Sequence, residues 1–111
     1  KPVVGLPGNP ISALVISWLF IQPLLFRMQG LQKEPFRNKI WAKLSLNMAS
    51  VAGREDWIPV LITCDDDGYT ADPVFFKSNL IFNLVNADGL MHIPADATGI
   101  SAGEMVQVSI L

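Results

Sequence analysis

The most constraining feature of the sequence is an apolar run at residues 11–26, directly preceded by the turn sequence Leu-Pro-Gly-Asn-Pro at residues 6–10. The 16 residues of this run fall short of the roughly 20 that a helix needs to cross a bilayer. Ser12, Ser17 and Pro23 also interrupt it. The run is therefore more typical of a buried helix than of a membrane span, and we expect no membrane partner.

Both ends of this predicted helix are marked in the sequence. Asn9 is a good N-cap, because its side chain accepts hydrogen bonds from early backbone N–H groups, and Pro10 suits the first helical position. Gly30 follows the cation Arg27 and is typical of a helix C-terminus. Pro23 removes a backbone donor inside the run, so we expect it to kink the helix or split it into two pieces.

Apolar side chains occur on every side of this helix, so the helix needs covering all round. They are Leu14, Val15, Trp18, Leu19, Phe20, Leu24 and Leu25. The rest of the chain can hardly supply that cover, and the sequence does not begin with methionine. We therefore expect a fragment whose covering partner is missing.

The later part of the chain has the alternation of β structure. A polar stretch ending in Pro35 marks a boundary, so we expect an incomplete unit at 1–33 and a β domain at 36–111. Strands are predicted at 40–46, 58–62, 90–94 and 106–110, with one short helix from a Ser78 cap to Val85. The predicted fold class is mainly β: a small barrel or sandwich with one short helix, preceded by the long apolar helix.

The acidic run Asp65-Asp66-Asp67-Gly68 lies between a predicted strand and Tyr69. It lacks the spaced oxygen ligands and the closing glutamate of a calcium loop. A solvated hairpin turn is therefore the favoured interpretation.

The composition excludes several classes of protein. Half of the residues are hydrophobic and 16% are charged, which argues against disorder, and the net charge of −2 gives no general attraction for nucleic acid. Cys64 is the only cysteine, so an internal disulfide and a cysteine-only metal cage are excluded. A single cysteine suits a reducing cytoplasm, where we expect the protein to be.

The usual catalytic and metal-binding patterns are missing from the sequence. His92 is the only histidine and lies within an apolar strand, where a structural role is commoner than a ligand role. Four carboxylates fall at predicted caps and turns and are interpreted as structural. They are Asp56, Asp88, Asp96 and Glu104. No metal site is predicted, and no catalytic residue can be named.

The turn before the helix is the one candidate anion site. Its glycines and prolines hold a tight bend in which backbone N–H groups and the positive end of the helix dipole face outward, and Ser12 adds a hydroxyl. An ordinary strand-to-helix turn with an asparagine cap and no ligand explains the same residues equally well. Arg54, and Lys77 beside Ser78, are further basic points that could instead be solvated charges.

Five segments, in this order, resemble the C-terminal part of MoeA-type molybdopterin molybdenumtransferases, the family that includes the E domain of gephyrin. They are Gly5–Ala13, Gln22–Leu24, Gly53–Arg54, Ala87–Leu90 and Gly103–Val108. The resemblance implies that the helix closes an α/β molybdopterin-binding domain and that the β unit is the family's domain IV. It also implies an enzyme that inserts molybdate into adenylylated molybdopterin with the help of Mg²⁺.

The resemblance further implies roles for matching residues. In the α/β part they are Pro7, Gly8, Asn9, Pro10 and Ser12, as anion or substrate contacts; in the β part they are Arg54, Lys77 and Ser78. Family members are dimers whose cleft joins two subunits, so the β-domain residues would act in trans. The magnesium ligands would lie upstream of Lys1, and the fragment alone would be inactive with no cofactor bound. Where many relatives have Ser-Gly, this chain has Ser78-Asn79, which weakens a phosphate-loop role for Ser78.

Two hypotheses follow from the sequence. The first is a C-terminal fragment of a molybdenum-insertion enzyme. The alternative is a free-standing β interaction module that docks onto a partner through its apolar helix. The length of the open reading frame upstream of Lys1 would distinguish them.

Overall fold

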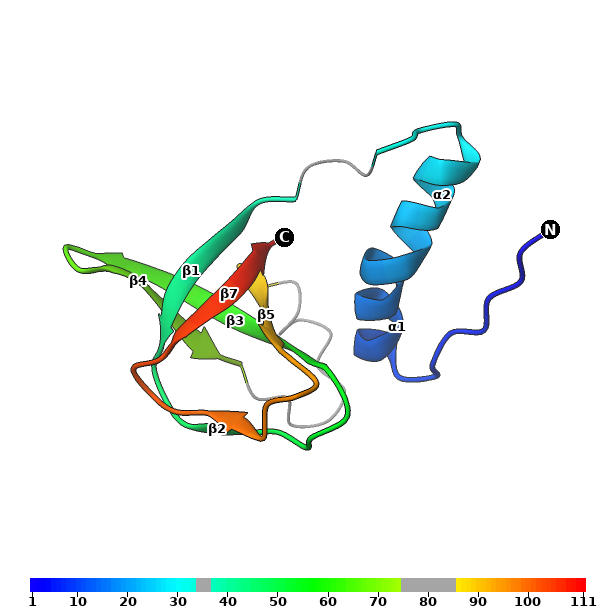
Figure 1. The fold of residues 1–111 in the computed structure, drawn as a ribbon. Coiled ribbons are helices and arrows are strands. Elements are labelled where there is room, and N and C mark those ends of the chain that lie inside the picture. The colour runs from blue at the N-terminus through cyan, green and yellow to red at the C-terminus, as the bar shows by residue number, and fades with distance from the viewer. Residues whose placement is uncertain (34–36, 75–85) are drawn as a thin grey trace.

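The structure, a computed structural model, describes residues 1–33, 37–74 and 86–111. Figure 1 shows a helix near the N-terminus lying beside a small β-barrel built from the later strands. The predicted class, mainly β with a barrel after a long helix, is confirmed. The predicted short helix from Ser78 to Val85 lies outside the described residues.

The helix begins and ends at the predicted residues. It starts with α1 (Pro10–Ile16), where the Asn9 Oδ1 atom accepts hydrogen bonds from the backbone N–H of Ile11 at 3.0 Å and of Ser12 at 3.4 Å. It ends with α2 (Gln22–Met28), after which Gly30 has a φ of 91°. A glycine at positive φ is the usual stop for a helix because it carries no Cβ.

The helix is split near Pro23, as predicted, because a wider, π-helical turn lies just before this proline. The π-helical segment η1 (Ser17–Ile21) separates α1 from α2. Proline has no N–H for the carbonyl four residues earlier, and a π-bulge is one way for a helix to absorb that missing bond. Pro23 itself lies in the first turn of α2, where its missing N–H costs least.

Arg37, which precedes the first strand, contacts the π-helical segment. Its Nη2 atom donates a hydrogen bond to the Trp18 carbonyl at 2.5 Å and another to Gln22 Oε1 at 3.4 Å. The guanidinium also covers the Trp18 ring, with Cζ 4.1 Å from the ring centroid, which is a cation–π contact. One side chain thus joins the helical part to the approach to the barrel.

Five strands close the barrel in the order β1-β4-β3-β5-β7. They are β1 (Lys39–Leu44), β3 (Asp56–Asp65), β4 (Gly68–Pro73), β5 (Gly89–Ile93) and β7 (Met105–Ile110). Neighbours pair antiparallel except β1 and β4, which pair parallel. Two short strands, β2 (Met48–Ala49) and β6 (Gly99–Ile100), form a separate two-stranded sheet.

The core lies inside this barrel and follows the alternation of the strands. Inward-facing side chains form one buried cluster: Ala42, Leu44, Val60, Ala71, Met91, Ile93, Val106 and Val108. Alternate residues of a strand point to opposite faces, so the apolar positions predicted from the sequence fill the barrel.

Several polar residues have the structural roles predicted for them. The Asp65–Gly68 segment is the turn of the β3–β4 hairpin, and Asp65 Oδ1 accepts a hydrogen bond from the Asp67 N–H at 3.0 Å. Asp88 Oδ2 accepts a hydrogen bond from the Ile62 N–H at 2.8 Å, and Asp56 Oδ2 lies 2.5 Å from the Ser50 hydroxyl. These carboxylates satisfy neighbouring donors.

The helix keeps much of its apolar surface exposed. Phe20 is 63% exposed and Met28 61% exposed, and Pro23 is the only buried residue of α1, η1 and α2. The 19 residues from Pro10 to Met28 are long and apolar enough to cross a membrane, a property shared by core helices of soluble proteins. The barrel therefore covers only part of the helix, as expected from its sequence.

Candidate functional site

The turn before the helix is exposed, and hydrogen bonds of the helix cap already use some of its backbone N–H groups. Residues 1–10 are all exposed. The side chain of Asn9 accepts from the N–H groups of Ile11 and Ser12, and the Asn9 carbonyl accepts from the Ala13 N–H at 2.9 Å. Asn9 therefore acts mainly as a helix cap, and it occupies two amides that an anion could otherwise use.

The remaining donors of the turn are few. In the described hydrogen-bond network, the amide of Gly8 and the hydroxyl of Ser12 donate to no protein acceptor. Ser12 is exposed in the first turn of α1, where the positive end of the helix dipole favours negative charge. The donors left for an anion in this turn are therefore the Gly8 amide and the Ser12 hydroxyl. Pro7 and Pro10 fix the backbone of the bend.

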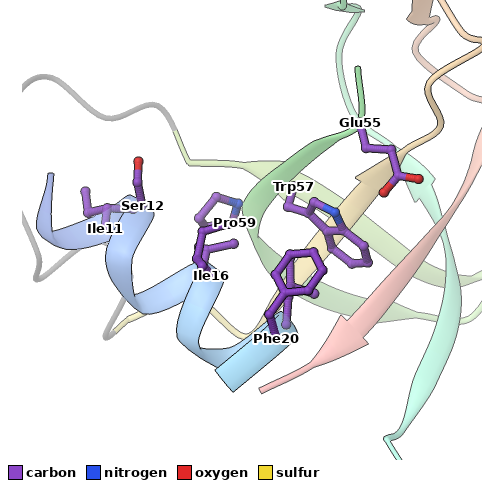
Figure 2. Close-up of a pocket in the computed structure, with 9 residues that line it drawn as sticks. Ile11, Ser12, Ile16, Phe20, Glu55, Trp57 and Pro59 are labelled. Carbon is purple, nitrogen blue, oxygen red and sulfur yellow. The ribbon is translucent and has the colours of Figure 1, made fainter. Parts of the chain in front are cut away.

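Ser12 also lines an open cleft of about 430 Å³ between the helix and the barrel. Figure 2 shows Ile11, Ile16 and Phe20 of the helical segments facing Trp57 and Pro59 of β3. Val15 and Leu19 complete the helical wall, and Glu55 lies at one end. The cleft is therefore an apolar space with a hydroxyl and a carboxylate among its lining groups, a common composition for ligand pockets.

Glu55 belongs to a small cluster at the start of β3. The His92 ring stacks on the Trp57 ring, with centroids 4.4 Å apart and an interplanar angle of 25°. His92 Nε2 lies 3.3 Å from Glu55 Oε2 and is buried, and it has no hydrogen-bond partner among the described residues. The predicted structural role of His92 fits this packing, since stacking holds the half-buried imidazole on the barrel wall.

Arg54 lies beside this cleft without lining it. Its Nε atom is 3.4 Å from Asp56 Oδ1, its side chain is 69% exposed, and Gly53 before it has a φ of 97°. The Gly53 N–H donates to the Ala95 carbonyl at 2.7 Å, which holds the loop against the barrel. Arg54 is therefore presented to solvent, next in sequence to Glu55 but outside the group of residues around Ser12.

The other predicted site residues do not add to this arrangement. Lys77 and Ser78 lie outside the described residues, so their position relative to Ser12 and Arg54 is untested. Within the three described ranges, no group of three or more His, Cys, Asp or Glu side chains could hold a metal ion. The donor set of this part of the chain does not fit a magnesium site.

The cleft itself was not predicted from the sequence. Trp57, Pro59 and Phe20 are far apart along the chain, and no spacing pattern links them. The only signal in the sequence was the turn before the helix, which located Ser12. Together, the residues offer an anion contact at the start of the helix and an apolar wall that could hold a larger organic group.

The sequence matches a known protein family over most of its length. Residues 41–111 match the sequence profile of the MoeA C-terminal region (domain IV). Over 110 residues, the chain is 33% identical to molybdopterin molybdenumtransferase 2 of Mycobacterium tuberculosis, covering 96% of this chain and 26% of that protein. Over a 110-residue alignment it is also 36% identical to the molybdopterin molybdenumtransferase of a Nostoc species, covering 95% and 24%.

Solved structures show the same likeness. The crystal structure of a molybdopterin biosynthesis MoeA protein from Pyrococcus horikoshii aligns with a TM-score of 0.76 and 34% identity. That alignment covers 99% of this chain and 26% of the other. The similarity therefore includes the turn and helix as well as the barrel, and the chain spans about a quarter of the length of the relatives it matches.

Proposed function

Since the chain belongs to the family of the MoeA C-terminal region (domain IV), we propose that it forms the C-terminal quarter of a molybdopterin molybdenumtransferase. The reaction is the insertion of molybdate into adenylylated molybdopterin, with release of AMP, in the cytoplasm. The observation that carries this proposal is the match of nearly the whole chain, turn and helix included, to a MoeA structure at 34% identity.

The contribution proposed for this chain is binding of a negatively charged group at the start of the helix. The Ser12 hydroxyl and Gly8 amide have no other protein acceptor in the described network, and both lie at the positive end of the helix dipole. An oxygen of molybdate or of the substrate phosphate is the group that they would hold. Asn9 supports them by fixing the helix start.

Magnesium is proposed to bind outside this chain. The described residues contain no cluster that fits it, so none of the steps assigned to this chain depends on the metal. The chain's own role is to bind and orient an anionic substrate. Alone, without the metal-binding part, it is expected to be inactive.

Arg54, Lys77 and Ser78 are proposed to contact substrate bound by a second subunit of a homodimer. Arg54 supports this arrangement: it is exposed to solvent and does not line the cleft that contains Ser12 of its own chain. A residue used by a partner subunit needs that accessibility on the outside of its own barrel.

The test uses the protein encoded by the complete reading frame that contains this chain. The purified protein is incubated with adenylylated molybdopterin, molybdate and Mg²⁺, and released AMP is quantified by chromatography. We expect AMP release that depends on molybdate, and loss of that activity when residues 37–111 are deleted. A full-length, folded protein that leaves adenylylated molybdopterin intact would overturn the proposal.

A second candidate function is an interaction module, because the helix has an exposed apolar face to which a partner could bind. In that case the reading frame would begin at this chain, and a partner would bind through residues such as Phe20 and Leu25. A reading frame that extends upstream by roughly two further domains, at the usual domain size, would support the enzyme instead.

A further inference from the structure

The barrel closes where β1 pairs with β4. This pairing is short and leaves part of the edge of each strand unpaired. β1 and β4 pair only at Lys43–Thr70 and Leu44–Ala71, whereas β1 pairs with β7 over five positions. In the described part of the chain, residues 39–42 of β1 pair only with β7, and residues 68–69 of β4 pair only with β3. Figure 1 shows the β3–β4 hairpin diverging from β1 and projecting from the barrel.

A pocket of about 170 Å³ lies at this open contact, and we call it the seam notch. It is lined by Trp41, Lys43, Asp65, Asp67, Gly68, Tyr69, Thr70 and Met105. Three large side chains in it are exposed: Trp41 at 61%, Met105 at 54% and Tyr69 at 45%. Tyr69 belongs to the same face of β4 as the buried Ala71, but it lies where the hairpin extends past the closed part of the barrel.

The charged side chains of the seam notch form no ion pair with the described residues. Both ion pairs in this part of the chain lie elsewhere, and neither involves Lys43, Asp65 or Asp67. The lining therefore contains two carboxylates and one ammonium group, and the exposed Asp66 lies between the two aspartates in the sequence. The net charge of the notch is therefore negative, which disfavours an acidic ligand and favours a cationic one.

We propose that the seam notch binds an extended, basic segment of a partner protein. The segment lies along the open edge of β1 at residues 39–42 and adds a strand there, since an unpaired edge offers backbone donors and acceptors to an incoming strand. Its apolar side chain packs on Trp41 and Met105. Exposed tryptophan and tyrosine are the side chains most often responsible for affinity at such surfaces.

A lysine or arginine of the segment sits at the hairpin end of the notch. There the Asp65 and Asp67 carboxylates attract the cation, and the aromatic side chains of Tyr69 and Trp41 line the same notch. Lys43, at the other side, can donate to backbone carbonyls of the segment. This binding is separate from the reaction proposed above, since the notch shares no residue with the cleft around Ser12.

The test measures binding of a labelled ten-residue peptide of alternating valine and threonine with one central lysine, by fluorescence anisotropy on the protein encoded by the complete reading frame that contains this chain. We expect binding about tenfold tighter than that of the same peptide with a central glutamate. N-methylation of the backbone amides along both edges of the peptide strand should abolish binding, because it removes the donors needed for strand pairing without changing the side chains.

Variants of the chain locate the binding surface. Trp41→Ala and the double variant Asp65→Asn with Asp67→Asn should each weaken binding at least about fivefold. Trp41→Phe, which keeps an aromatic face, should retain most of it. Asp96→Asn, at a carboxylate outside the notch, is the matched control and should bind normally, and circular dichroism confirms that each variant is folded.

Three results would overturn the proposal. The first is equal binding of the lysine and glutamate peptides, or no saturable binding of either. The second is unchanged binding by the N-methylated peptide. The third is a concentration-dependent dimer that Trp41→Ala dissolves, because the occupant of the notch would then be a second copy of this chain.

Discussion

Substitution of Gly89 by alanine is the sharpest test of the barrel. Gly89 begins β5 and pairs with Val60 of β3 on one side and Ile110 of β7 on the other. A Cβ atom at this position would lie 2.6 Å from Val108 Cγ1 and 2.7 Å from the Ser109 carbonyl oxygen. Cβ atoms essentially never approach other heavy atoms this closely, so the strands would have to move apart.

The expected cost is at the upper end of the overpacking range, about 3 kcal/mol. One obstructing atom belongs to the β7 backbone, which cannot rotate away, and the other belongs to a β-branched valine with few alternative rotamers. A loss of about 3 kcal/mol lowers the folded-to-unfolded ratio by roughly a hundredfold or more. For a barrel of this size it should lower the melting temperature by about 10 to 20 °C.

Urea unfolding followed by circular dichroism measures this cost. Gly103→Ala is the matched control: Gly103 has a φ of 89°, but the position that a Cβ would take there has no atom within 4 Å of it. Only backbone strain of about 1–2 kcal/mol therefore applies to the control. Adding Val108→Ala to Gly89→Ala should cost less than the two single changes together. If Gly89→Ala is less costly than Gly103→Ala, the close approach of β5 to β7 is wrong.

Further substitutions distinguish residues that bind substrate from residues that stabilise the fold. Asn9→Ala should lower the free energy of unfolding by about 1 kcal/mol in urea titrations, because it removes the helix cap. In the full-length protein, Ser12→Ala should weaken molybdate or phosphate binding about tenfold by calorimetry and leave the thermal melt unchanged; normal binding would remove Ser12 from the site. Arg37→Lys keeps the charge but loses the planar stack on Trp18, and should speed amide exchange across the π-helical segment. The 111-residue chain should self-associate in sedimentation experiments, and Phe20→Ser should reduce that association.

Local patterns predicted the strands well where one face is buried and the other exposed. β1 alternates as expected, because the barrel covers only its inner face; β7 alternates from Met105 to Val108, but the next residue, Ser109, is buried as well. β5 is instead buried at every position except the half-buried His92. Its Leu90 points away from the core and lines a second hollow with Leu14 and Trp18, so the helix covers the outer face of this strand.

Features that depend on distant pairing were not predictable from such patterns. β2 and β6 have two residues each, too few for any alternation to be visible. The parallel contact of β1 with β4 is likewise a consequence of how the barrel closes, and no local signal marks it. The same applies to the cleft, whose helical and strand walls come from opposite sides of the domain boundary predicted at Pro35.

The residues that carry the family resemblance divide into two groups once the fold is known. Asp88 holds the Ile62 amide, Gly89 permits close strand approach, and Asn9 caps the helix, so the fold alone explains their presence. Ser12 and Arg54 are different. The Ser12 hydroxyl has no partner in the described network, and the ion pair that the largely exposed Arg54 side chain forms with Asp56 contributes little to stability. Because the fold does not require these two side chains, they are the strongest candidates for direct contact with substrate.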